Sequence, residues 1–318
     1  GDGKLLSQLI KKKVIFDFLD DCAEIGVKGI SFVSDGESTI SPIFTDACKY
    51  GHELGLSMAV GTNAFVLTKN RLEDVMPYLT YLRVNFSAGE KKRYAEIMGV
   101  KESYFDRVVQ NIKDMVEIKK KNNLSVTIGL QMVLMPEYSD QVLPLAKLGK
   151  ELQPDYLIIK HCSDNEDGDL GVDYSGYKDI YNILEKAESY SDDNYKVKVK
   201  WSKIKSGENR TYSRCYGAPF MIQISGSGLV APCGMLFNEK YKRYHIGNIC
   251  DKRFKDIWKS KEYWEVMNHL ASGMFDAKTM CGTLCLQHKV NEALDNHVKG
   301  TKKLEQVVDK KIPHLNFI

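Results

Sequence analysis

The chain has 318 residues, which is enough for one large domain or for a large domain and a small one. A hydrophobic share of 43% and a charged share of 27% are ordinary for a globular protein, and the net charge of +3 gives no reason to expect nucleic acid or a membrane surface as a partner. No apolar run approaches the roughly 18 residues of a membrane span and no secretory signal is present, so we expect a cytoplasmic protein.

The sequence starts with Gly1-Asp2-Gly3 rather than Met and passes directly into a helical pattern, so we expect that an upstream segment is missing. From there to about residue 200, helical patterns alternate with short apolar runs. The predicted helices cover residues 5–25, 41–54, 68–79, 102–121, 139–152 and 174–190. The predicted strands cover residues 29–33, 57–61, 81–86, 125–134, 156–160 and 196–201.

This alternation determines the predicted fold class. Strands separated by helices of roughly 10–20 residues indicate βαβ units and a parallel sheet. Six such strands, with room for another upstream, fit a partial or full barrel better than a two-layer α+β fold. We therefore predict an α/β barrel for this part of the chain.

The pattern changes after about residue 205. Residues 221–224 and 229–231 flank Ser225-Gly226-Ser227-Gly228, which predicts a β-hairpin with a glycine turn. Two short helices and a terminal helix are predicted after the hairpin, at 254–258, 260–270 and 288–298. We therefore predict two domains, a barrel over residues 1–204 and a small α+β domain over residues 205–318.

Eight cysteines are many for a chain without a secretory signal. Where disulfides are not expected, clustered cysteines indicate metal binding or catalysis. Cys22 and Cys48 stand singly inside helical patterns, and we expect them to be buried as small hydrophobic side chains. Four others have the spacing of metal ligands: Cys215, Cys233, Cys281 and Cys285.

The predicted hairpin would bring Cys215 near Cys233, and the three-residue spacing between Cys281 and Cys285 would add two more thiolates. Four thiolates suit either tetrahedral zinc or an iron–sulfur cluster. The spacing therefore predicts a metal site without choosing the metal, and four unrelated cysteines are the alternative.

The motifs around the quartet choose the metal by resemblance. Residues 215–295 contain GSGLVAPC, in which four residues separate Gly228 from Cys233, then HIGNICDKRFKDIWKSKEYW and CGTLCLQHKVNEALD. This stretch resembles the SPASM/twitch domain that follows the barrel in many radical S-adenosylmethionine (SAM) enzymes. Its four cysteines match the shorter twitch form, and the resemblance implies an auxiliary [4Fe–4S] cluster.

The first 200 residues in turn resemble the partial (β/α)6 TIM-like barrel of the radical SAM type. Ser34-Asp35-Gly36-Glu37-Ser38-Thr39 stands at the place of the family's GGE motif, with Asp35 and Ser38 where Gly and Pro are frequent. The resemblance implies that Gly36 and Glu37 meet the methionyl amino group of SAM. Glycine permits close backbone approach, and a carboxylate accepts hydrogen bonds from an ammonium group.

Further motifs follow in the family's order. The segment that contains Thr62 and Asn63 is similar to TNG, and LRVNFSAG is similar to RVSLDAG. The resemblance places Asn85 and Ser87 near the carboxylate or ribose of SAM, and Gln131 near its adenosyl part. Each lies on or at the end of a predicted strand, on the face where barrel active sites form.

Four other residues are candidates for the reaction itself. Lys160, His161 and Cys162 follow a strand-like run and are either loop residues or substrate contacts over the barrel mouth. Cys250 lies outside the quartet, and we expect a buried structural thiol there ahead of a hydrogen-atom donor of the kind that some radical SAM epimerases use. Cys162 is the second candidate donor.

The family's CxxxCxxC loop, which holds the catalytic [4Fe–4S] cluster, is absent from residues 1–318, and the family places it upstream. We expect a truncated chain that does not cleave SAM by itself, ahead of a degenerate paralogue. For the intact enzyme the resemblance implies reductive cleavage of SAM, hydrogen abstraction by a 5′-deoxyadenosyl radical, and an electron donor such as flavodoxin or ferredoxin.

The substrate is inferred from what the sequence lacks. It contains no peptide-recognition domain, so we expect oxidation or epimerisation of a small molecule such as a carbohydrate, ahead of a maturase that modifies a peptide or protein. The alternative of another class is a zinc-stabilised binding protein, which metal analysis would distinguish. A metal-free barrel hydrolase would leave the four cysteines unexplained.

Overall fold

The computed structural model of the chain describes residues 10–33, 36–164, 168–206, 210–281, 285–305 and 314–317. They form two compact units. The unit that we call the barrel unit contains the described residues of 29–163 and 171–207. The unit that we call the cysteine unit contains those of 1–28, 164–170 and 208–318. Within the described ranges, no helix is long and apolar enough to cross a membrane.

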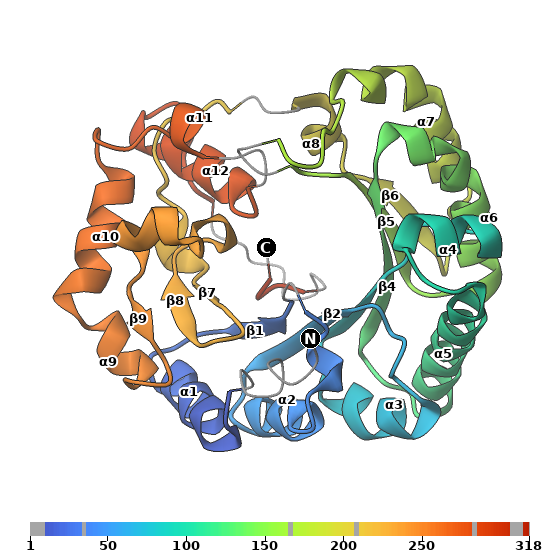
Figure 1. Cartoon of the computed structure of the whole chain (residues 1–318), viewed down its shortest axis with the longest axis horizontal. Helices are drawn as coiled ribbons and strands as arrows, with labels where there is room; N and C mark the ends of the chain where they lie inside the picture. Colours follow the sequence, from blue (N-terminus) through green and yellow to red (C-terminus); the bar gives the residue numbers. More distant parts are fainter. Residues whose placement is uncertain are drawn as a thin grey trace. The chain divides into compact units, whose positions relative to one another are not determined.

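A six-stranded parallel sheet forms the centre of the barrel unit, and its strands follow one another in chain order (Figure 1). The strands are β1 (Gly29–Phe32), β2 (Ser57–Thr62), β3 (Tyr81–Asn85), β4 (Thr127–Leu134), β5 (Tyr156–His161) and β6 (Lys196–Val199). Each strand pairs in parallel with the next through a helical crossover. The predicted α/β partial barrel is confirmed.

Helices connect the strands and lie outside the curved sheet (Figure 1). They are α2 (Phe44–Glu53), α3 (Lys69–Val75), α4 (Lys91–Met98), α5 (Glu102–Lys121), α6 (Val142–Leu152), α7 (Tyr181–Glu188) and α8 (Trp201–Ser206). Successive strand residues point to opposite faces of a sheet, and those that face the helices, such as Val84, Leu130 and Ile159, are fully buried. The same alternation places polar side chains on the opposite face, which we call the concave face.

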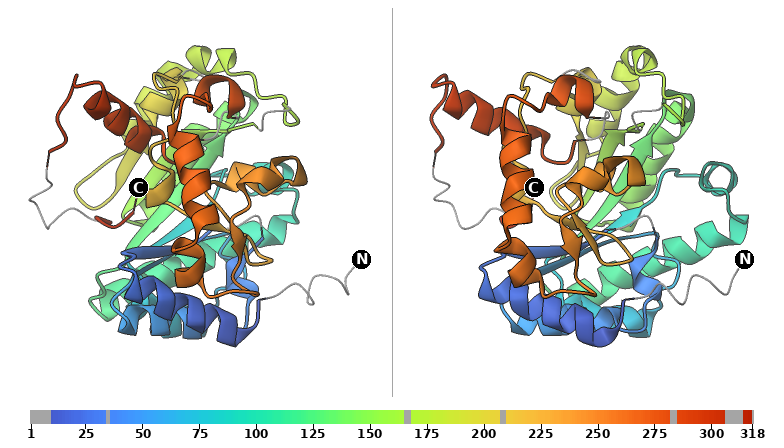
Figure 2. Two further views of the ribbon diagram at one scale, coloured as in Figure 1. Left: turned by 90° about the vertical axis from the view of Figure 1, so that its left-hand side faces the viewer. Right: turned by 60° about the vertical axis from the view of Figure 1, so that its left-hand side comes forward.

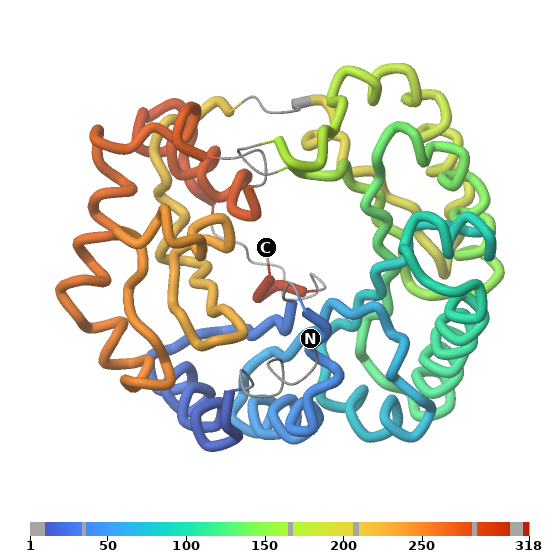
Figure 3. Tube along the Cα trace, in the orientation of Figure 1, coloured from blue at the N-terminus to red at the C-terminus, as the bar shows by residue number. Residues whose placement is uncertain are grey.

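The cysteine unit contains a three-stranded antiparallel sheet in the order β7–β8–β9, whose path Figure 3 traces. Its strands are β7 (Gln223–Ile224), β8 (Leu229–Ala231) and β9 (Gly247–Asn248). The predicted hairpin joins β7 to β8, and Gly228 closes its turn at a φ of +86°, which favours glycine. A Cβ on Gly228 would lie 2.5 Å from Asn248 Oδ1 and 2.9 Å from Cys250 Sγ.

The helices of the cysteine unit come from both ends of the chain. They are α1 (Lys12–Glu24), α9 (Phe254–Trp258), α10 (Lys261–Ala271), α11 (Ala277–Met280) and α12 (His288–Val298). Helix α1 lies beside α9 (Figure 2), where the ring centroids of Phe18 and Phe254 are 5.1 Å apart. Helix α1 thus belongs to the same compact unit as C-terminal residues, whereas the sequence pattern predicts that residues 1–204 form one barrel domain. The domain boundary between residues 204 and 205 stays a prediction.

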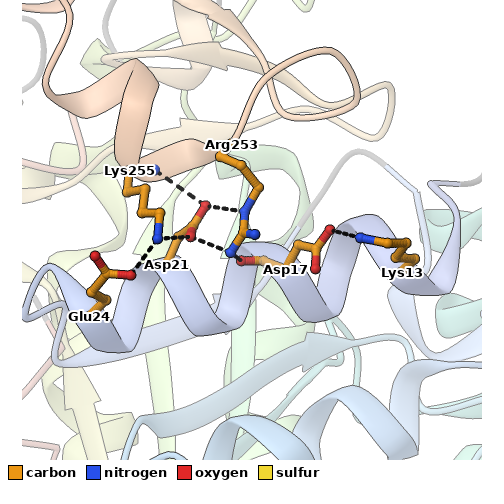
Figure 4. Close-up of polar contacts among 6 residues, drawn as sticks. All are labelled: Lys13, Asp17, Asp21, Glu24, Arg253 and Lys255. Atoms are coloured by element: carbon orange, nitrogen blue, oxygen red, sulfur yellow. Dashed lines mark hydrogen bonds and ion pairs between the residues drawn. The ribbon is translucent and has the colours of Figure 1, made fainter.

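Ion pairs also join α1 to α9 (Figure 4). The carboxylate of Asp21 is fully buried and accepts from Arg253 at both oxygens, with Nε 2.9 Å from Oδ2 and Nη2 2.5 Å from Oδ1. Lys255 Nζ lies 3.8 Å from Asp21 Oδ1 and 2.6 Å from Glu24 Oε2. The buried charge of Asp21 is therefore paired, as a buried carboxylate must be.

The sixth strand is shorter than predicted. It ends at Val199, and Trp201 begins α8 instead of extending the strand. The indole Nε1 donates to Glu188 Oε2 at 3.0 Å, and the ring meets the edge of Tyr181. Packing on α7 therefore places this aromatic residue where the strand pattern alone would not. The first helix is predicted over residues 5–25, and its residues 5–9 lie outside the described part.

Candidate functional site

Glu37 ties the loop after β1 to the end of β2. Its Oε1 accepts from the Thr39 N–H at 3.1 Å, the Thr39 hydroxyl at 2.6 Å and the Thr62 hydroxyl at 2.8 Å. Its Oε2 accepts from the Asn63 N–H at 2.7 Å. Three of the predicted SAM-binding residues, Glu37, Thr62 and Asn63, are thus brought together. A carboxylate oxygen with one such bond retains a lone pair for an ammonium donor.

Asn85 and Gln131 lie abreast on β3 and β4, because the two residues are partners in the sheet register. Gln131 Nε2 donates to Asn85 Oδ1 at 2.8 Å. Ser87 lies two residues after Asn85, the last residue of β3, and is buried. Asn85 and Gln131 therefore form a second polar group toward the carboxyl ends of the strands, where barrel active sites lie.

The loop after β2 contains a strained residue. Ala64 is buried in the left-handed region with a φ of 60°, a conformation that costs a non-glycine residue roughly 1–2 kcal/mol. Its N–H donates to the Thr62 hydroxyl at 2.9 Å, and its carbonyl accepts from Asn111 Nδ2 at 2.7 Å. These bonds hold the loop that carries Asn63.

Gly36 is exposed, and a Cβ added to it would meet nothing within 4 Å, so space beside its backbone is open to a ligand. The departure from the family motif at Asp35 lies outside the described residues. Ser38 begins a 3-10 helix, η2 (Ser38–Ile40), whose N-cap is Glu37.

Lys160 and His161 point to opposite faces of the sheet. Lys160 lies on the concave face, where burial and neighbouring cations lower its pKa to about 8. His161 points to the helix-covered face beside the Tyr177 ring, and burial lowers its pKa to about 4. Cys162 is also buried, and its N–H donates to the Tyr177 hydroxyl at 3.0 Å. This geometry favours Lys160 over His161 as a substrate contact, and the role of Cys162 as a second candidate hydrogen donor stays a prediction.

The four cysteines of the quartet converge in the cysteine unit. The charge of a Cys281 thiolate would act on Cys215, Cys285 and Cys233, so all four sulfurs share one neighbourhood. Burial raises the pKa of Cys215 to about 11 and that of Cys281 to about 12. Such thiols are neutral until a metal binds them as thiolates.

Helix α12 and the residue before it hold the segment of Cys215. Asn291 Oδ1 accepts from the Gly217 N–H at 2.7 Å, while Asn291 Nδ2 lies 3.6 Å from Cys215 Sγ. Gln287 Nε2 donates to the carbonyls of Met221 at 3.0 Å and Pro232 at 3.4 Å. One helix end therefore positions the backbone on both sides of the hairpin and aims a donor at the sulfur.

The sulfurs of Cys285 and Cys233 also receive hydrogen-bond donors. Tyr212 Oη lies 3.2 Å from Cys285 Sγ, and the backbone amides of Gly234 and Met235 donate to Cys233. Hydrogen bonds to ligand sulfurs are one of the means by which a protein sets the potential of an iron–sulfur cluster. The donor set therefore fits a thiolate-bound cluster.

The remaining cysteines differ among themselves. Cys22 and Cys48 are buried to 1% and 0% exposure, which confirms the prediction for both. Cys250 is exposed at the end of β9, with its Sγ 3.8 Å from the Ser227 carbonyl, so the expectation of a buried thiol was wrong. Its role as a hydrogen donor stays a prediction.

Sequence patterns missed the polar residues that support both sites. Asn111 and Asn291 lie inside helical patterns, where a polar residue is expected on the solvent side, yet both are buried. Tyr212 gave one usable signal, its position three residues before Cys215. Asn291 gave another, because it stands in the motif that closes the resemblance.

Residues 215–285 match the family model of SPASM, an iron–sulfur cluster-binding domain. The tungsten-containing aldehyde ferredoxin oxidoreductase cofactor-modifying protein of Pyrococcus furiosus is 22% identical over 258 residues, which cover 77% of this chain and 71% of that protein.

SuiB and anSMEcpe are among the solved structures that share the fold. SuiB of Streptococcus suis bound to S-adenosylmethionine aligns with a TM-score of 0.62 at 17% identity, over 86% of this chain and 65% of SuiB. The structure of anSMEcpe with bound AdoMet and the Cp18Cys peptide aligns with a TM-score of 0.59 at 16% identity, over 83% of this chain and 76% of that chain. The chain thus spans just under two thirds of SuiB.

Proposed function

On the premise that this chain pairs the partial barrel of the radical SAM enzymes with a SPASM domain, we propose that it abstracts a hydrogen atom from a peptide or protein substrate with the help of SAM. The observation that carries this proposal is the convergence of four thiols inside the residues that match the SPASM model. SAM, when bound and reductively cleaved, supplies the radical.

The choice of a peptide rests on the relatives. SuiB has been crystallised with its precursor peptide SuiA, and anSMEcpe with the Cp18Cys peptide. The preference for a small molecule that the sequence favoured has no support in these comparisons. A maturase that modifies a peptide or protein is therefore the better proposal.

In this proposal the barrel residues hold SAM. Glu37 accepts from the methionyl ammonium with the carboxylate oxygen that also holds the Asn63 amide. Asn85 and Gln131, already joined by a hydrogen bond, present polar groups to the carboxylate, ribose or adenosyl part. The strained loop at Ala64 fixes this arrangement before the ligand arrives, which lowers the entropy cost of binding.

The cysteine quartet would hold an auxiliary [4Fe–4S] cluster, which supplies a one-electron acceptor or shapes the substrate site. Four sulfurs around one zinc ion lie about 3.8 Å apart, because each Zn–S bond is about 2.3 Å. The quartet lies within residues 215–285, which match an iron–sulfur cluster-binding domain, and this match supports a cluster over the zinc alternative.

The test is anaerobic incubation of the full-length protein, as it is encoded, with SAM, a reductant and a candidate precursor peptide. We expect 5′-deoxyadenosine and a peptide product that differs by the loss of two hydrogens or by a new linkage, both detected by mass spectrometry. The Glu37→Ala variant should form neither. Peptide modification without SAM consumption would overturn the proposal.

A further inference from the structure

Two lysines stand side by side at the carboxyl edge of the barrel sheet. Ile159 of β5 is the register partner of Val199 of β6, so the next residues, Lys160 and Lys200, lie abreast. The Lys200 N–H donates to the Ile159 carbonyl at 2.8 Å, which keeps the two strand ends together at this level. Both side chains point to the concave face, and neighbouring strands are only about 4.8 Å apart.

Neither lysine is neutralised within the described residues. No hydrogen bond or ion pair joins the ammonium group of Lys160 or Lys200 to a described carboxylate. Arg83 of β3 and Lys203 of α8 act on Lys160 as further like charges. Like charges directly opposite each other on neighbouring strands destabilise a sheet. Lysines that repel each other at the mouth of a barrel, without a described carboxylate between them, point to an anionic ligand.

Arg83 is held on the same face by a built arrangement. Gly129 of β4 leaves room for the Tyr156 ring, since a Cβ there would lie 2.1 Å from the ring Cζ. Tyr156 therefore crosses β4 and reaches Arg83, which also lies over the ring of Tyr81 at 5.6 Å. The Nε of Arg83 is buried without a hydrogen-bond partner among the described residues.

Protection of a sheet edge explains only part of this charge. β6 is an outer strand of the six-stranded sheet, and exposed lysines on such strands block pairing with other chains. That role accounts for Lys196 and Lys198. It does not account for Lys160, which is half-buried on an inner strand, or for Arg83 three strands from that edge.

We infer that Lys160, Lys200 and Arg83 receive a carboxylate of the substrate on the concave face. The inference rests on the proposed function and narrows it: the peptide carries an acidic side chain, or its own C-terminal carboxylate, near the residue that is modified. Charge-assisted hydrogen bonds from two lysines and an arginine to the carboxylate would offset the repulsion among the three cations.

The test uses three fluorescein-labelled peptides of one Gly/Ser-rich sequence and the reconstituted full-length protein with SAM. One peptide contains Glu and ends in an amide, the second contains Gln and ends in a free carboxylate, and the third contains Gln and ends in an amide. At low ionic strength, we expect at least one carboxylate peptide to bind roughly ten-fold more tightly than the neutral one by fluorescence anisotropy. The tighter of the two identifies the source of the carboxylate.

Variants assign the effect to the cluster. Lys160→Gln and Lys200→Gln should each remove most of the discrimination between the peptides, while Lys186→Gln, the same charge change on the exposed face of α7, should leave it intact. Circular dichroism verifies that each variant is folded. Equal binding of all three peptides, or discrimination that survives in the double variant, would overturn the inference.

SAM affinity and 5′-deoxyadenosine formation are measured on the same samples, so the two proposals fail separately. Wild-type protein that neither binds nor cleaves SAM would overturn the proposed function. Normal SAM cleavage without discrimination between the peptides would overturn only the carboxylate site. A loss of SAM affinity in Lys160→Gln would assign the cluster to the cofactor and would also overturn the inference.

Discussion

The side-chain amide of Asn291 joins the backbone next to Cys215 to the sulfur of Cys215 itself. Its oxygen accepts from the Gly217 N–H at 2.7 Å, and its nitrogen lies 3.6 Å from Cys215 Sγ. The same residue therefore supports the loop and tunes the ligand. Substitution can separate the two roles, because the side-chain oxygen of Asn291 holds the backbone and its side-chain nitrogen faces the sulfur.

Asn291→Asp keeps the oxygen that holds Gly217 and loses the N–H that points to Cys215. We expect the midpoint potential of the auxiliary cluster to become more negative, since a donor to ligand sulfur stabilises the reduced state. Asn291→Leu should shift the potential in the same direction and also cost about 1–3 kcal/mol of stability, because the buried Gly217 N–H loses its partner. Redox titration followed by EPR checks the first effect, and a potential unchanged in Asn291→Asp contradicts it.

The ion pair between Asp21 and Arg253 should dominate the stability of the contact between α1 and α9. Arg253→Met leaves a fully buried carboxylate with Lys255 at 3.8 Å as its remaining cation, and we expect a loss of roughly 3 kcal/mol in urea unfolding. Lys13→Met is the control, since Lys13 is 83% exposed in its pair with Asp17 and should change stability by at most about 0.5 kcal/mol. Equal effects of the two substitutions would refute this reading.

Replacement of Lys160 by an apolar side chain should stabilise the protein. Burial, helped by Arg83, Lys203 and Lys200, lowers its pKa from 10.5 to about 8. Below the folded-state pKa, Lys160 is charged in both the folded and the unfolded protein, and the full free-energy cost of its buried charge is present. Between the folded-state and the unfolded-state pKa, folding releases a proton, so the stability of the protein rises with pH. We expect Lys160→Met to gain about 2 kcal/mol near pH 7, and the gain to shrink above pH 8.

The measurement for Lys160 is urea unfolding of wild type and variant at both pH values, with Lys186→Met as the control for loss of an exposed charge. A variant that is less stable near neutral pH would contradict the assignment. Together with weaker binding of carboxylate peptides, a stability gain would show that the fold tolerates Lys160 for its function.

Glu37→Gln should weaken SAM binding at least about ten-fold, because the amide cannot accept with both of its atoms and carries no charge for the methionyl ammonium. Stability should fall less than for Glu37→Ala, which leaves the Asn63 N–H and both threonine hydroxyls without their common acceptor. Isothermal titration calorimetry with SAM gives the affinity. Unchanged affinity in a folded Glu37→Gln variant would remove Glu37 from the site.

Sequence patterns predicted the barrel well because strand and helix periods are local. The helix at Glu102–Lys121 and the terminal helix at His288–Val298 have the predicted bounds, and all six strands were anticipated. Trp201 was misassigned because its packing on Glu188 and Tyr181 is a tertiary effect. Tertiary context of this kind overrides local propensity.

The candidate sites were predicted less completely. Spacing identified the quartet, and the resemblance to the radical SAM motifs selected Glu37, Asn85 and Gln131, but no local pattern shows that Asn291 turns toward a sulfur. The opposite directions of Lys160 and His161 follow from strand alternation only once the strand is known to include both residues. Register likewise reveals the pairing of Lys160 with Lys200, which lie forty residues apart in the sequence.

The most direct test of the account is the iron and acid-labile sulfide content of the anaerobically reconstituted protein, with and without the quartet. Replacement of Cys215, Cys233, Cys281 and Cys285 by Ala should lower both by about four atoms per chain, the content of one [4Fe–4S] cluster, while Cys250→Ala should lower neither. Iron and sulfide that remain unchanged in the quadruple variant, or about one zinc per chain in place of iron, would contradict the account.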